Sequence, residues 1–99
     1  MDSLIADPCV VVATKEHFSS PLGDDIIILD VKAGVYFSLD NVGALVWDLV
    51  QSPISVKDLR TAILEKYEVD PEVCERDLLA LLRELADRNL VEIRNAVSA

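Results

Sequence analysis

The spacing of hydrophobic residues changes once along this sequence, at Asp40. Before Asp40, apolar residues form short runs rich in β-branched side chains, at residues 26–31 and 35–39. After Asp40 they recur at helical spacing, beginning with Val42 and Leu45. β-Branched runs favour strands, whereas helical spacing places apolar side chains on one face of a helix. The chain is therefore predicted to begin with strands and to continue with helices.

Three strands are expected in the first part of the chain, at residues 9–13, 26–31 and 35–39. The last two are separated by Lys32, Ala33 and Gly34. They should be antiparallel neighbours, because glycine in the last loop position permits the left-handed backbone of a tight hairpin. Between the first two strands, a cluster of small and polar residues predicts a loop that contains Ser19, Ser20, Pro21, Gly23, Asp24 and Asp25.

Residues that commonly begin or end helices divide the remainder into three helices. A serine with an acidic residue three positions later resembles a capping box, and an aspartate before a proline is a strong helix start. The first helix is expected to begin at Asp40 or Asn41 and to end at Ser52 and Pro53. The second is expected to begin at Ser55, with Asp58 three residues later, and the third to begin at Asp70 and Pro71 and to end at Asn89. A short extended tail is expected at residues 90–93.

The third helix has one apolar face, formed by Cys74, Leu78, Leu81, Leu82 and Leu85. A turn of about four residues between the first two helices matches helix-turn-helix spacing. Together these patterns predict an α+β fold of winged helix-turn-helix type, with a three-stranded antiparallel sheet followed by three helices. We expect a single domain over residues 1–99, with a core at about residues 8–93.

Length and charge exclude several function classes. With 99 residues, the chain is too short for a multidomain enzyme. Its 9 basic and 18 acidic residues give a formal net charge of -9, which disfavours binding to a nucleic-acid backbone. No apolar stretch approaches the length of a membrane span, and no secretory signal is recognisable, so we expect a cytoplasmic protein without a membrane partner.

Catalytic and metal-binding motifs find little support in the sequence. His17 is the single histidine and is expected in a loop, while Asp24 and Asp25 read as turn formers rather than paired catalytic carboxylates. Cys9 and Cys74 lie far apart without metal-ligand spacing, so both are interpreted as small buried hydrophobes. We therefore expect no enzymatic activity, no cofactor and no metal.

Two binding functions remain open from the residues alone. Helix-turn-helix geometry is typical of DNA-binding regulators, although the predicted second and third helices mix acidic and basic residues and present no basic stripe. Alternatively, residues 35–39 carry no charge and no proline, so an exposed edge there could pair with an extended peptide. A terminal tail could equally cover that edge. Trp47 is expected to pack in the core.

The hairpin and the helix that follows it resemble the PqqD-like family. In that family a hairpin is followed directly by a helix. The hairpin has the pattern leucine-aspartate, small turn, glycine, x, tyrosine, aromatic, x, leucine, and the helix has the pattern glycine-alanine-x-x-tryptophan. The matching residues here are Leu29-Asp30, Gly34, Tyr36-Phe37, Leu39, Gly43-Ala44 and Trp47, with further similarity at Tyr67-Glu68-Val69-Asp70 and Asn89-Leu90-Val91. The similarity runs in one unbroken order over roughly residues 8 to 93.

The resemblance implies a non-catalytic recognition element for ribosomally made, post-translationally modified peptides. Such a domain holds the leader of a precursor peptide as an added strand beside its third strand, in a groove completed by its third helix. It presents the peptide to a modifying enzyme, which is a radical-SAM enzyme in pyrroloquinoline quinone and related pathways, or a leader peptidase and cyclase in lasso peptide pathways.

Carried onto this sequence, the resemblance implies a set of peptide-binding residues. Those on the strand are Val35, Tyr36, Phe37 and Leu39, and those in the groove are Cys74, Asp77, Leu78 and Leu81, with Arg76 or Glu84 at the rim. The implied partners are the precursor peptide and its modifying enzyme. Both a monomer and a dimer remain compatible with the sequence.

Overall fold

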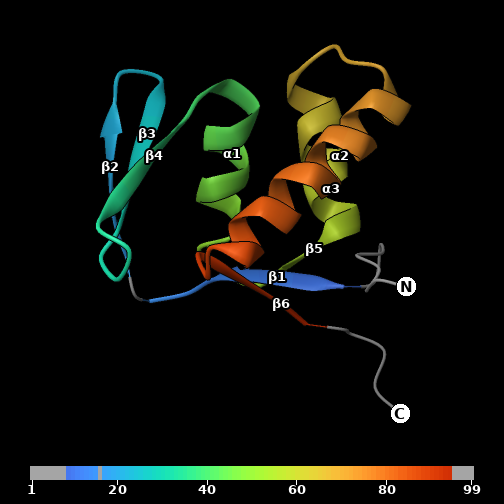
Figure 1. Ribbon diagram of the computed structural model, residues 1–99. Helices are drawn as coiled ribbons and strands as arrows, with labels where there is room; N and C mark the ends of the chain where they lie inside the picture. The colour runs from blue at the N-terminus through green and yellow to red at the C-terminus, as the bar shows by residue number, and fades with distance from the viewer. Residues whose placement is uncertain (1–8, 16, 95–99) are drawn as a thin grey trace.

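The computed structural model of the protein describes residues 9–15 and 17–94. Within these residues, three helices and six strands form an α+β fold (Figure 1). In chain order the elements are β1 (Val10–Ala13), β2 (His17–Leu22), β3 (Asp25–Asp30), β4 (Val35–Leu39), α1 (Asn41–Leu49), β5 (Ile54–Ser55), α2 (Val56–Lys66), α3 (Pro71–Asp87) and β6 (Val91–Arg94).

One antiparallel sheet has the strand order β2-β3-β4. Its β3–β4 hairpin is the predicted one, with Ile28 opposite Phe37 and Asp30 opposite Val35. The buried Asp30 side chain shapes the turn, because its Oδ1 accepts hydrogen bonds from the backbone N–H groups of Lys32 and Ala33 at 3.1 and 3.2 Å. Gly34 then adopts a φ of 71°, a left-handed conformation that glycine takes without a Cβ clash.

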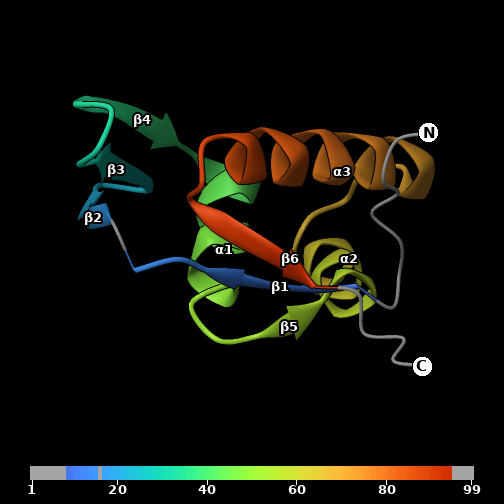
Figure 2. The same ribbon diagram turned by 60° about the horizontal axis from the view of Figure 1, so that its bottom comes forward.

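The second antiparallel sheet has the order β5-β1-β6 and joins segments far apart in the sequence. Val11 of β1 lies opposite Ile54 on one side and Ile93 on the other. The predicted extended tail therefore forms β6. Figure 1 shows this sheet beneath the helices, and Figure 2, with the bottom of the molecule turned forward, shows it in front of them, away from the β2-β3-β4 sheet.

All three helices begin at predicted cap residues, and in two of them the cap side chain accepts a hydrogen bond. The hydroxyl of Ser55 accepts a hydrogen bond from the backbone N–H of Asp58 at 3.0 Å, and the Asp70 carboxylate accepts bonds from the first turn of α3. Asp40 begins α1 without a side-chain cap, and its carbonyl accepts from the N–H of Gly43 at 2.8 Å. After α3, the positive φ of Asn89 ends the helical path, as expected.

The hydrophobic core lies between the helices and both sheets. Trp47 of α1 is only 1% exposed, and it packs with fully buried residues from α2, α3 and both sheets. Cys9 and Cys74 are both free and buried in this core. The predictions that Trp47 packs in the core and that the cysteines are small buried residues are therefore confirmed.

The fold class is confirmed, but three details of the predicted strands are wrong. The predicted loop at residues 19–25 is mostly β2, and its Pro21 is tolerated because β2 is an edge strand. The strand at residues 9–13 belongs to the other sheet, so the three-stranded sheet before the helices contains β2 in its place. His17 consequently begins a strand rather than lying in a loop. No helix in the described part of the chain is long and apolar enough to cross a membrane.

Candidate functional site

Strand β4 has one free edge. It is the outermost strand of the β2-β3-β4 sheet, and among the described residues no strand pairs with its outer side. The C-terminal strand β6, which could have covered this edge, pairs with β1 instead. Since β4 has no charge and no proline, its outward N–H and C=O groups can accept an additional strand.

A mostly apolar cavity of about 300 Å³ lies between the end of β4 and the first half of α3. The lining residues come from β4, the start of α1, α2, the α2–α3 connection and α3, and are Ser38, Leu39, Asp40, Val42, Gly43, Ile63, Val69, Cys74, Asp77, Leu78 and Leu81. Five of the eight residues that the family resemblance implied are among them: Leu39, Cys74, Asp77, Leu78 and Leu81. We call this cavity, together with the free edge of β4, the β4–α3 groove.

Gly43 lets helix α1 approach β4 at the floor of the groove. A Cβ atom at this position would lie 3.2 Å from the Cβ of Leu39, which is tighter than ordinary van der Waals contact. A larger residue would therefore displace Leu39, which lines the cavity. This close contact gives a physical reason for glycine in the glycine-alanine-x-x-tryptophan pattern.

Three further predicted residues lie along β4, beyond the cavity. Val35 and Tyr36 are exposed, Tyr36 to 72%. Phe37 is partly buried, and the guanidinium carbon of Arg88 lies 4.4 Å from the centre of its ring. This cation–π contact joins β4 to the residue that follows α3, so α3 passes β4 at both ends of the groove.

The charged residues expected at the rim do not line the cavity. Arg76 forms an exposed ion pair with the neighbouring Asp77, with 3.9 Å between Nε and Oδ1. Glu84 pairs with Arg88, with 3.8 Å between Oε2 and Nε. Sequence reasoning missed Arg88, because nothing in a linear pattern places a helix-ending arginine over an aromatic ring of a distant strand.

Cys74 lies in the lining of the groove as a neutral thiol. Burial raises the pKa of the Cys74 thiol above its ordinary value, while the nearby Arg60 guanidinium acts in the opposite direction. A raised pKa keeps the thiolate fraction small at neutral pH, so Cys74 is a weak nucleophile there. Its side chain therefore contributes a small apolar surface to the groove.

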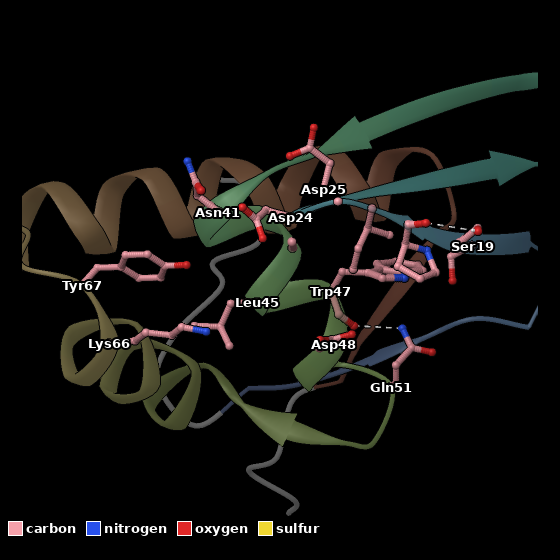
Figure 3. A pocket seen from close by; sticks show the side chains of 15 residues that line it. Ser19, Asp24, Asp25, Asn41, Leu45, Trp47, Asp48, Gln51, Lys66 and Tyr67 are labelled. Atoms are coloured by element: carbon pink, nitrogen blue, oxygen red, sulfur yellow. Dashed lines mark hydrogen bonds between the residues drawn. The ribbon is translucent and has the colours of Figure 1, made fainter.

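A larger cavity, of about 580 Å³, lies between the β2–β3 turn, α1 and the end of α2 (Figure 3). Asp24, Asp25 and Asp48 give it an acidic lining, and Lys66 is the basic residue facing them. Within the described ranges, no three His, Cys, Asp or Glu side chains are arranged to hold a metal ion. Asp24 lies in the β2–β3 turn, as expected, whereas Asp25 is the first residue of β3 and pairs with Leu22.

His17 is placed against Trp47 rather than beside a nucleophile. The two rings meet edge to face with 4.8 Å between their centroids. Both ring nitrogens of His17 and the indole Nε1 of Trp47 are buried without a hydrogen-bond partner among the described residues. This contact packs β2 against α1.

Comparison with known proteins places these features in a family. The model of the family described as coenzyme PQQ synthesis protein D (PqqD) matches residues 25–91, which include β3, β4 and all three helices. A search of curated proteins gave no match.

Two solved structures share the fold. TbiB1 in complex with the TbiA(beta) leader peptide is 33% identical, with a TM-score of 0.75 over 82% of this chain and 94% of that chain. Lasso peptide synthetase B1 complexed with the leader peptide is 23% identical, with a TM-score of 0.72 over 83% and 96%. The family match spans more than half of the chain, and a structure of 33% identity covers most of it. The chain therefore belongs to the PqqD family.

Proposed function

We propose that this protein binds the leader segment of a ribosomally synthesised precursor peptide in the β4–α3 groove and presents it to a modifying enzyme. The leader adds to the free edge of β4 as a further strand. Its side chains on the groove side enter the apolar cavity beside α3. The protein itself has no catalytic role.

One observation carries this proposal: the uncharged edge of β4, which no described strand covers, lies directly beside an apolar cavity. Strand addition uses main-chain hydrogen bonds for affinity and pockets for alternate side chains for specificity. The groove contains both parts, because β4 supplies the edge and Leu39, Leu78 and Leu81 supply the apolar lining. Recognition of this kind suits an extended peptide better than a compact ligand.

The comparisons support the choice of peptide and of pathway. TbiB1 is in complex with a leader peptide, and the second structure is a lasso peptide synthetase component complexed with one. We therefore favour a lasso peptide pathway, in which the partner enzymes are a leader peptidase and a cyclase, over a radical-SAM partner. Location in the cytoplasm and a single domain over residues 1–99 stay predictions.

The test is a titration of the ¹⁵N-labelled chain with the synthetic leader of its precursor, followed by amide hydrogen exchange. Successive N–H groups of an edge strand point alternately inward and outward. Strand addition should therefore slow exchange at alternate residues of β4, and the signals of Cys74, Leu78 and Leu81 should shift. Shifts confined to residues outside β4 and α3 would contradict the site. Binding to duplex DNA without binding to the leader would contradict the function.

A further inference from the structure

The β2-β3-β4 sheet has an apolar face that no described element covers. Residues opposite each other in an antiparallel sheet point to the same side, and Phe18, Leu29 and Tyr36 are cross-strand neighbours. They alternate with Ile28 and Asp30, which are buried toward the core. Phe18 is 69% exposed and Tyr36 72%. Figures 1 and 2 show the three helices on the other side of this sheet.

The composition of this outer face is opposite to that expected of a solvated sheet face. Antiparallel sheets with one free face commonly place polar residues on it. By the strand register, the outward residues here are Phe18, Ser20, Leu22, Asp25, Ile27, Leu29, Tyr36 and Ser38. Asp25 is the single charged residue among them, in a chain whose formal net charge is -9. Phe18, Ile27, Leu29 and Tyr36 surround a shallow hollow of about 320 Å³.

The size of the outer face and the net charge of the chain favour a larger protein partner over a second copy of this chain. The face has eight outward residues on three strands. A standard stable interface uses about 20–30 residues from each partner, so two copies packed on this face alone would bury too little. Such a dimer would also bring together two chains of net charge -9. A larger partner that reaches beyond the face avoids both difficulties.

The outer face is continuous with the proposed peptide site. Tyr36 and Ser38 of β4 belong to the face, and the free edge of β4 borders the groove. A leader strand added to β4 would direct every second side chain into the groove and the remaining side chains to the outer face. The bound leader would thus extend the apolar face by one strand.

We propose that the outer face of the β2-β3-β4 sheet is the docking surface for the enzyme that acts on the bound peptide. This inference rests on the proposed leader binding. The complementary surface of the enzyme has an apolar centre, which covers Phe18, Leu29 and Tyr36, and a basic rim suited to this acidic chain. Because the enzyme contacts the face and the outward side chains of the leader together, each ligand strengthens the binding of the other.

The experiment measures two affinities for each variant. Fluorescence anisotropy with a labelled leader measures the affinity of the groove for the leader. Biolayer interferometry measures the affinity for the leader peptidase that acts on the same precursor, in an inactive form in which the nucleophile of the peptidase is replaced by alanine. The face is changed by Phe18→Ser and by Leu29→Thr. Val73→Thr is the matched control, because Val73 and Leu29 are exposed to 40% and 38% and Val73 lies on α3.

Both face variants should bind the leader within about twofold of the parent, which also shows that they are folded, and should bind the peptidase at least roughly tenfold more weakly. Val73→Thr should resemble the parent in both assays. Saturating leader should raise the affinity of the parent for the peptidase by roughly fivefold or more.

Other results would overturn the inference. If both face variants bind the peptidase as tightly as the parent, the outer face is not the docking surface, and the proposed leader binding is unaffected. If the parent fails to bind the leader, the proposed function itself is refuted. Peptidase affinity that does not respond to leader would refute the shared surface. If the parent forms a dimer in sedimentation, and the face variants lose the dimer but still bind the peptidase, the face belongs to a second copy of this chain. If the parent binds anionic phosphatidylglycerol vesicles, and the face variants lose this binding but still bind the peptidase, the face belongs to a membrane.

Discussion

Ala80 and Leu81 are neighbours in α3 but face different surroundings. Leu81 is partly buried and lines the β4–α3 groove, whereas Ala80 is exposed and lines none of the cavities described above. The two positions therefore allow the same charge to be introduced inside and outside the groove on one helix.

Leu81→Glu should weaken leader binding by at least roughly tenfold, because an apolar leader side chain would meet an unpaired carboxylate. Ala80→Glu adds the same charge on the solvent side and should bind normally. Leader titrations with both variants, accompanied by circular dichroism, measure the difference. If folded Leu81→Glu bound leader as well as the parent, this flank of α3 would not be the binding side.

The Cys74 thiol can report occupancy of the groove. Its buried position and raised pKa predict slow alkylation by iodoacetamide at pH 8, and a bound leader should slow the reaction further by covering the cavity. The measurement uses a Cys9→Ala background, so that mass spectrometry counts one thiol. Equal alkylation rates with and without saturating leader would show that the leader does not cover Cys74.

At the scale of the element, the β3–β4 hairpin depends on its turn. Gly34 has a φ of 71°, and a Cβ added to it would meet no atom within 4 Å, so substitution acts on backbone conformation alone. Gly34→Ala should lower the free energy of unfolding by about 1 kcal/mol. Urea denaturation measures this loss. Gly23→Ala, with a φ of 66° and equally open surroundings, should cost about the same in the β2–β3 turn.

Strand β4 itself allows a test of strand addition. Along an edge strand, alternate N–H groups point to the neighbouring strand and to the open side. Tyr36→Pro and Phe37→Pro should therefore differ in kind: one variant loses a bond to β3 and is broadly destabilised, and the other stays folded but loses leader binding. Thermal melts and leader titrations distinguish them.

Each proline variant is compared with the alanine variant at the same position. This comparison subtracts the loss of the Tyr36 ring and of the Phe37 ring, which is stacked under Arg88. If the better-folded proline variant bound leader as tightly as its alanine counterpart, the leader would not be adding to β4.

At the scale of the whole molecule, the net charge of -9 separates peptide binding from DNA binding. Affinity from backbone pairing and apolar contact should change by less than about threefold between roughly 50 and 200 mM salt, whereas a phosphate-binding protein loses about a thousandfold or more. Parallel titrations with leader and with duplex DNA measure both slopes. A steep salt dependence of leader binding would indicate that charge pairing, rather than the groove, supplies the affinity.

The sequence by itself determined the features that depend on neighbouring residues. The Ser55 and Asp70 caps, the glycine of the β3–β4 turn and the apolar face of α3 follow from local backbone geometry and helical periodicity, and all are found in the structure. The family resemblance followed from the order of these same local patterns.

Tertiary structure alone decided which strands share a sheet and where the groove closes. Ser19, Ser20 and Pro21 favour a loop locally, yet pairing with β3 holds them in an edge strand. The strand β1 joins β5 and β6 across more than 40 residues, and Arg88 meets Phe37 only after α3 has packed. Such contacts depend on the free energy of packing distant segments together, and that energy leaves no pattern in adjacent residues.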